Sequence, residues 1–289
     1  MEREKINKIF FLLARHPRLF SERLYFKIKV FLKSVLRKKI NGILFEFNFS
    51  LDPEIENMYE GHYESEIVKL MERTLKKGDA FIDVGANIGY LSAIALGFVG
   101  KSGQVHSFEP VPEYFSKLNK LVVANRAYKI FINQCALGDK QEKAKINVTS
   151  QLNIGWNTIV PKFMPNENVK QAIEVNVIRL DSYIKERGVN NIKLIKIDVE
   201  GFEFPVLKGV SDYFKMTNNR PLIICEIAPA AYPLLGFKII DLLKYMKKYS
   251  YRAFSTVNRD AEIDITKLET TQNVLFINEY DTSWRKNLS

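Results

Sequence analysis

The sequence is poor in the residues that build metal centres and disulfide frameworks. It has two cysteines, Cys135 and Cys225, and three histidines among 289 residues. No CxxC or HxxxH spacing occurs, so neither a zinc site nor a disulfide scaffold is expected. We therefore predict a protein without a bound metal, from a reducing compartment such as the cytoplasm.

Long uninterrupted apolar runs are also missing. Near the N-terminus the longest uncharged stretch covers residues 9–14, far below the ~20 apolar residues of a membrane-spanning helix. The longer uncharged run at 84–100 is broken by glycines, and no signal-peptide cleavage pattern is present. With 46% hydrophobic and 26% charged residues, the composition is that of a globular protein with a sizeable core.

Positive charge is concentrated at the N-terminus. The net charge is +10, of which residues 1–40 contribute +9, so the remainder is almost neutral. Apolar residues in this stretch recur at helical spacing: Leu24, Ile28, Phe31, Leu32 and Val35. We predict a basic amphipathic helical arm and a lead-in strand over residues 1–50. Such an arm can rest on an anionic membrane surface; alternatively, it packs its apolar face on the body.

From residue 80 onward, short apolar runs alternate with helical patterns. The expected strands in this part are 81–84, 104–108, 130–135, 192–197, 222–227, 251–255 and 274–277, and the expected helices are 90–98, 112–124, 202–209 and 238–248. Before it we expect a strand at 43–51 and a helix at 64–75. This order predicts an α/β fold, with helices on both faces of a mostly parallel sheet. We take residues 51–289 as one domain, in which 138–180 form an inserted hairpin or lid.

Two motifs follow neighbouring strands of this predicted sheet. The first is DVGANIGY at 83–90, a strand end, a glycine turn and a helix start. It lacks the second and third glycines of the dinucleotide fingerprint, which disfavours NAD. The second is FEP at 108–110, where Glu109 lies 20 residues past Gly89. A carboxylate there suits the two hydroxyls of a ribose, so the pair predicts a nucleoside site.

The third motif, KIDVEGFE at 196–203, places carboxylates at the end of a later strand. Asp198, Glu200 and Glu203 belong to it, and Glu226 ends the next strand. Like charges this close raise at least one pKa, and a carboxylate with a raised pKa can act as a general base. The same oxygens could instead gather Mg²⁺ or Ca²⁺, although no histidine supports that alternative.

Together these motifs resemble the FkbM-type family of S-adenosylmethionine-dependent methyltransferases. The resemblance covers about residues 55–228 and includes Tyr63-Glu64, Asn125, the ALGD stretch at 136–139 and Leu180-Asp181. It implies the class I (Rossmann-like) methyltransferase fold, with a seven-stranded sheet whose last strand is antiparallel. It also implies S-adenosylmethionine as cofactor and a hydroxyl acceptor, mostly on sugars of glycans and glycolipids or on secondary metabolites.

The resemblance also implies cofactor-binding residues. These are Asp83, Gly85, Ala86, Asn87 and Gly89 around the methionine and ribose, Glu109 and Pro110 at the ribose, Cys135, Ala136 and Leu137 beside the adenine, and Asp198. Candidates for substrate contact are Trp156, Asn157 and Tyr63. Our own assignment of the general base is Asp198, followed by Glu200, Glu226 and Glu203.

Three alternatives stay open at the level of the sequence. The chain could be a cofactor-binding module that has lost its chemistry, or a methyltransferase for a small metabolite. A nucleic-acid methyltransferase is disfavoured, because the nearly neutral body offers no broad basic face for phosphates. We expect a hydroxyl-bearing partner, carbohydrate in kind, and no nucleic acid. For residues 1–40 two possibilities stay open: peripheral contact with the inner face of a membrane, or packing on the body. The oligomeric state is left open.

Overall fold

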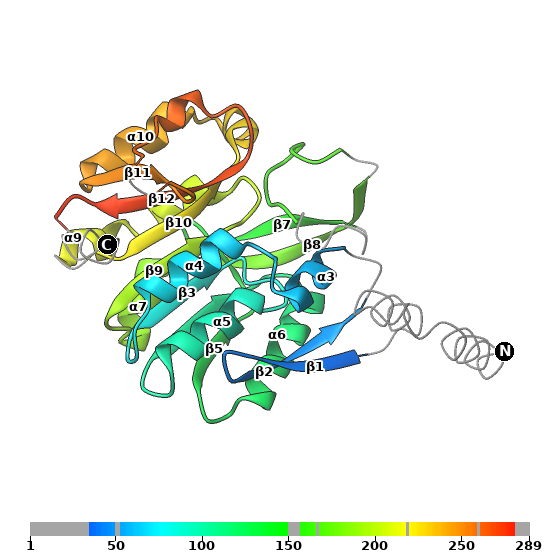
Figure 1. The fold of residues 1–289 in the computed structure, drawn as a ribbon. Coiled ribbons are helices and arrows are strands. Elements are labelled where there is room, and N and C mark those ends of the chain that lie inside the picture. Colours follow the sequence, from blue (N-terminus) through cyan, green and yellow to red (C-terminus); the bar gives the residue numbers. More distant parts are fainter. Residues whose placement is uncertain are drawn as a thin grey trace, which may run out of the picture.

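Seven strands form the central sheet of the computed structural model (Figure 1). The structure describes residues 35–49, 53–149, 157–165, 168–217, 220–258 and 261–280. The strands are β3 (Ala80–Val84), β4 (Gln104–Phe108), β5 (Lys129–Asn133), β9 (Ile192–Ile197), β10 (Leu222–Ile227), β11 (Tyr251–Ser255) and β12 (Gln272–Asn278). Their order is β11-β12-β10-β9-β3-β4-β5, and β12 is antiparallel to both neighbours. This topology confirms the expected class I methyltransferase fold.

Helices cover both faces of this sheet. One face is covered by α4 (Ser65–Thr74), α5 (Tyr90–Val99) and α6 (Pro112–Ala124). The other is covered by α7 (Leu180–Arg187), α8 (Glu203–Lys208), α9 (Ser211–Met216) and α10 (Ile239–Lys248). Alternate residues of each strand enter opposite clusters: Phe81 packs on the first face and Ile82 on the second. Because both faces are buried, the parallel strands are almost continuously apolar.

The predicted insertion forms a separate small sheet. β7 (Glu142–Thr149) and β8 (Val169–Ile178) pair antiparallel, and β6 (Ala136–Leu137) pairs parallel with the end of β8. In Figure 1 this sheet stands beside the carboxyl ends of β9 and β10. The inserted hairpin is therefore placed next to the edge where ligands of such folds bind.

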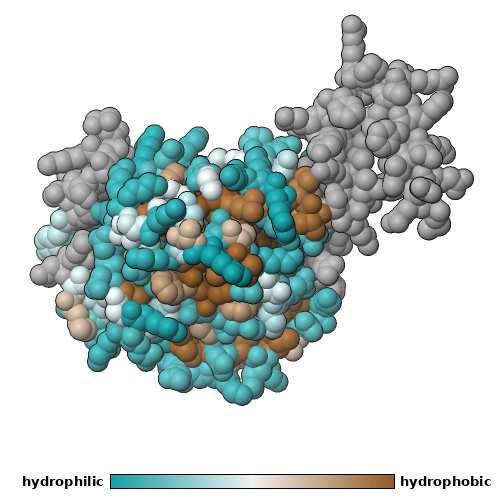
Figure 2. All heavy atoms as spheres, turned by 90° about the horizontal axis from the view of Figure 1, so that it is seen from below, coloured by the Kyte–Doolittle hydropathy of each residue, from teal (hydrophilic) through white to brown (hydrophobic). Residues whose placement is uncertain are grey.

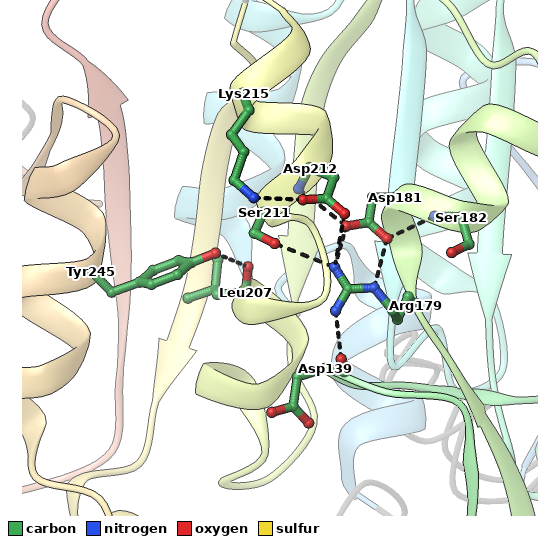
Figure 3. A network of polar contacts seen from close by, with 9 residues as sticks. All are labelled: Asp139, Arg179, Asp181, Ser182, Leu207, Ser211, Asp212, Lys215 and Tyr245. Atoms are coloured by element: carbon green, nitrogen blue, oxygen red, sulfur yellow. Dashed lines mark hydrogen bonds and ion pairs between the residues drawn. The ribbon is translucent and has the colours of Figure 1, made fainter.

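A cluster of polar contacts fixes the base of this insertion (Figure 3). Arg179, just after β8, donates from Nε and Nη2 to both carboxylate oxygens of Asp181, at 3.0 and 2.5 Å. Its Nη1 donates to the backbone oxygen of Asp139, at 2.5 Å, and Nη2 reaches Ser211 Oγ at 3.3 Å. One guanidinium thus joins both ends of the hairpin to α9, which is the fork geometry for which arginine is suited.

The N-terminal part differs from expectation. Val35–Ile40 forms strand β1, which pairs antiparallel with β2 (Ile43–Asn48). The predicted amphipathic helix therefore cannot include Val35, because a turn at Asn41 and Gly42 folds these residues into a hairpin. The other residues of that arm, 1–34, lie outside the described part of the chain. β2 was predicted correctly, because its phenylalanines alternate and pack on α5 and α6.

The remaining regular elements are short. They are α3 (Pro53–Glu60) and the 3₁₀ turns η3 (Pro229–Leu235) and η4 (Ile265–Lys267). Figure 2 views the molecule from below, where hydrophobic side chains gather in a band across a largely hydrophilic face. Within the described residues, none of the helices has the length and apolar character needed to cross a bilayer.

Candidate active site

A cavity of about 320 Å³ lies at the carboxyl ends of β3, β4, β9 and β10. Its volume falls in the range of small-molecule sites, roughly 300–1,000 Å³. The predicted cofactor residues that line it are Asp83, Gly85, Ala86, Asn87, Glu109, Pro110, Cys135, Ala136, Leu137 and Asp198. Three motifs that are distant in sequence therefore meet at one edge of the sheet, as the strand alternation predicted.

Gly85 is required by the backbone of the protein itself. It has φ +81°, and a Cβ at this position would lie 1.8 Å from the backbone oxygen of Asp198. Its N–H donates to Phe108 O at 3.0 Å, and Asp198 N donates to Val84 O at 3.0 Å. The turns after β3, β4 and β9 are thus held in direct contact, which only a residue without Cβ permits.

Gly89, which was predicted as a cofactor-binding residue, lies close to Leu118 of α6. It is not among the residues that line the cavity. A Cβ here would lie 2.5 Å from Leu118 Cδ1, and φ is +86°. This glycine therefore allows the start of α5 to pack against α6.

Glu109 presents a buried carboxylate at the end of β4. It is 5% exposed, and its oxygens accept hydrogen bonds from Asn87 N at 2.9 Å and Val111 N at 2.8 Å. Burial raises the pKa of Glu109 to about 7, against the lowering effect of these two donors. Each oxygen keeps a further lone pair, so the carboxylate is oriented and can accept two more donors.

Two polar groups show how a nucleoside would fit beside Glu109. Asn87 Oδ1 is buried without a hydrogen-bond partner among the described residues, and Asn87 has a left-handed backbone with φ 52°. An orphaned buried acceptor is costly, which a ligand hydroxyl or amine would relieve. Asp83, by contrast, already accepts a 2.5 Å hydrogen bond from Ser92 Oγ and is 2% exposed. The residues present therefore fit an adenosine-containing cofactor.

Three carboxylates gather at the other end of the cavity. Asp198, Glu200 and Glu226 each offer an oxygen within 4.8 Å of the others. The charge of Asp198, followed by burial, raises the pKa of Glu226. Burial, followed by Asp198, raises the pKa of Glu200. The two glutamates thus favour their protonated forms. The oxygens of all three residues are also the kind of ligand that a hard cation such as Mg²⁺ or Ca²⁺ binds.

Lys196 was not predicted as a site residue. It is 2% exposed, and its Nζ donates to Asp198 Oδ2 at 2.5 Å and lies 3.7 Å from Glu64 Oε1. The neighbouring carboxylates raise its pKa well above the usual value, although burial acts in the opposite direction. The available signal was a lysine inside the apolar run of β9, two residues before an aspartate.

Glu203 lies behind the cavity. It is fully buried and is not a lining residue. Its Oε1 accepts a 2.6 Å hydrogen bond from Gly201 N, which supports the left-handed turn at Glu200 and Gly201, with φ 51° and 99°. The structure thus places Glu203 where it holds the turn, whereas the sequence offered it as the last of four candidate bases.

Two of the three residues predicted to contact the acceptor lie in the described part of the chain. Tyr63 and Asn157 line the cavity, whereas Trp156 lies outside the described residues. Next to Asn157, Thr158 Oγ1 donates to Glu200 O at 2.6 Å. The hairpin segment that bears Asn157 is therefore tied to the acidic turn.

Comparison with known proteins gives consistent matches. The family model described as "Methyltransferase FkbM domain" matches residues 83–253. A Streptomyces tacrolimicus protein named 31-O-demethyl-FK506 methyltransferase FkbM is 33% identical over 163 residues, 48% of this chain. The match covers 62% of that relative, so this chain spans less than two thirds of its length.

Two further matches extend over more of the chain. The hexuronic acid methyltransferase AglP of Haloferax volcanii is 22% identical over 234 residues, which are 81% of this chain and 89% of AglP. A crystal structure of methyltransferase FkbM from Methylobacillus flagellatus is similar at 16% identity, with a TM-score of 0.43. That match covers 78% of this chain and 55% of the other.

Proposed function

Because the chain belongs to the FkbM methyltransferase domain family, whose cofactor is S-adenosylmethionine, we propose that it methylates a hydroxyl group. The observation that carries this proposal is the single cavity lined by both Glu109 and Asp198. Glu109 is the oriented carboxylate for a ribose, and Asp198 is a carboxylate suited to receive a proton. The cavity at this sheet edge therefore has a part that suits a nucleoside and a part that suits proton transfer.

The proposed acceptor is a sugar hydroxyl in a glycan or glycolipid. AglP supports a sugar acceptor, since it is named for a hexuronic acid. The relative named for 31-O-demethyl-FK506 supports methylation of an oxygen, but its name does not refer to a sugar. Asn157 and Tyr63 lie on the cavity wall and offer polar groups for hydroxyls. A hydroxyl on a small metabolite is the alternative acceptor.

The bound cofactor supplies a methyl group activated by a sulfonium, so the protein has mainly to position the acceptor and remove its proton. Asp198 is the proposed base, because it lines the cavity and its Oδ2 is held in place by a 2.5 Å hydrogen bond from Lys196 Nζ. Glu226 and Glu200 have raised pKa values, so they hold protons and can donate hydrogen bonds to the acceptor. Glu109 and Asn87 orient the cofactor on the other side of the cavity.

Ligand-dependent melting tests the cofactor. S-adenosylhomocysteine at ~100 times its Kd should stabilise the protein by about 2.7 kcal/mol. Glu109→Ala should lose that stabilisation, while the control Glu113→Ala, whose side chain is exposed in the first turn of α6, should keep it. A melting shift with NADH alone would refute the methyltransferase proposal.

The base is tested in a second experiment. Asp198→Asn should abolish methylation of a sugar acceptor panel even at saturating S-adenosylmethionine, where weakened cofactor binding through Asp198 cannot account for the loss. Unchanged turnover would exclude Asp198 as the base. Tight cofactor binding by wild type without transfer to sugar or metabolite acceptors would favour a binding module that has lost its chemistry.

The basic N-terminal stretch is proposed to contact anionic membrane surfaces, on its charge alone. Because β1 begins at Val35, the informative deletion removes residues 1–34 and leaves the β1–β2 hairpin intact. We expect wild type, but not the deletion, to sediment with phosphatidylserine-containing vesicles at low salt. Equal sedimentation of both proteins would refute this proposal.

A further inference from the structure

Glu64 directs its carboxylate away from the helix that it precedes. It occupies the position before α4, yet its side chain makes no capping hydrogen bond and its backbone is left-handed, with φ 45°. For a residue with Cβ this conformation costs about 1 kcal/mol or more, and it persists when the surroundings impose it. Glu64 is one of the residues that line the cavity, together with Glu109 and Asp198.

The two oxygens of Glu64 have unequal surroundings. Oε1 lies 3.5 Å from Asn273 Nδ2 and 3.7 Å from Lys196 Nζ. Oε2 is buried and has no hydrogen-bond partner among the described residues. Burial raises the pKa of this carboxyl, although Lys196 opposes the effect. A buried oxygen without a donor is costly, which indicates that a donor is supplied by a ligand.

The order of the strands shows in which direction a ligand bound at Glu109 extends along the sheet edge. Glu109 follows β4, Gly85 follows β3, and Lys196 and Asp198 lie at the end of β9. These strands are adjacent in the order β9-β3-β4, so a nucleoside held at Glu109 extends across Gly85 toward β9. Glu64 lies at that far end, beside Lys196.

The side chains around Glu64 favour a positively charged ligand group. Among the described residues that line the cavity, Lys196 is the one basic side chain, and it already lies beside Glu64 and Asp198. We propose that Glu64 binds the α-ammonium group of the amino-acid part of the cofactor through Oε2, with Lys196 positioning Glu64 and Asp198. This assignment rests on the proposed function and adds the subsite that holds the cofactor's amino-acid end.

Calorimetric binding of two neutral-sulfur ligands tests the assignment. S-adenosylhomocysteine carries the amino acid, whereas 5′-methylthioadenosine lacks it and shares the nucleoside. Glu64→Gln should weaken the first ligand about 10- to 100-fold, the worth of one hydrogen bond to a charged group, and leave the second within twofold. The control Glu72→Gln, on the exposed side of α4, should change neither.

The possible outcomes separate this inference from the proposed function. If wild type binds neither ligand, the proposed function fails. If wild type binds both and Glu64→Gln has no effect, or weakens both equally, the function stands and the ammonium site is refuted. Should the variant not fold, the wild type is titrated with an S-adenosylhomocysteine analogue whose amino group is replaced by hydrogen. An affinity equal to that of S-adenosylhomocysteine would refute the site.

Discussion

Replacing Glu203 by glutamine should make the protein less sensitive to alkaline pH. Glu203 is fully buried at the start of α8, and its Oε1 accepts the Gly201 N–H at 2.6 Å. Glutamine keeps this acceptor oxygen and nearly the same volume, but it does not titrate. The substitution therefore removes the cost of a buried charge without removing the support of the turn.

The magnitude follows from the pKa of Glu203. Burial raises this pKa from 4.5 to about 8, so the carboxyl favours folding below pH 4.5 and loses that contribution as the pH rises through 8. Each pH unit in this interval costs about 1.4 kcal/mol. From pH 5 to pH 8 the loss is about 2–4 kcal/mol, where the lower figure allows for relaxation around the charge.

Urea unfolding at pH 5 and pH 8 measures this effect. The free energy of unfolding of Glu203→Gln minus that of wild type should increase by about 2–4 kcal/mol between the two pH values. For the exposed control Glu72→Gln the corresponding difference should stay within about 0.5 kcal/mol. If the difference in free energy of unfolding between Glu203→Gln and wild type does not change with pH, Glu203 is not protonated in the folded protein, which refutes this prediction.

Three further predictions concern the cavity and the hairpin. Gly85→Ala should prevent accumulation of soluble folded protein, measured by expression and circular dichroism, because its Cβ would overlap the backbone oxygen of Asp198. Arg179→Ala should lower the free energy of unfolding by about 3 kcal/mol in urea titrations, since it leaves Asp181, which is 7% exposed, without its guanidinium partner. The affinity for S-adenosylhomocysteine should fall as the pH drops below about 7, where Glu109 becomes protonated, and this pH dependence measured by calorimetry should vanish in Glu109→Gln.

The sheet edge was predictable because it depends on local patterns. Parallel strands that alternate with helices bring all their carboxyl ends to one side, so Glu109, Asp198 and Glu226 were expected to meet. The roles of the glycines were predicted less well. Gly85 was expected to admit a ligand, whereas its lack of Cβ also admits the oxygen of Asp198, a contact that no local pattern encodes.

The charge partners of the site were not predictable for a related reason. Lys196 Nζ lies 3.7 Å from Glu64 Oε1, but Lys196 belongs to a central strand, whereas Glu64 stands just before α4, far earlier in the sequence. A lone lysine in an apolar run also suits a strand end that reaches solvent. Only the packing of α4 over β9 shows that this lysine is 2% exposed and faces carboxylates.

The inserted hairpin is connected by hydrogen bonds and packing to the acidic turn at Glu200 and Gly201. Thr158 is fully buried, exchanges backbone hydrogen bonds with Asn147 of β7, and donates its hydroxyl to the backbone oxygen of Glu200. Val160 packs against Gly201, where a Cβ would approach it to 3.2 Å. Because Asn157 lines the cavity directly beside Thr158, an acceptor that displaces this segment also displaces the turn bearing Glu200. Under the proposed contact between Asn157 and the acceptor, we therefore expect acceptor binding and the geometry of the acidic turn to be coupled through the backbone.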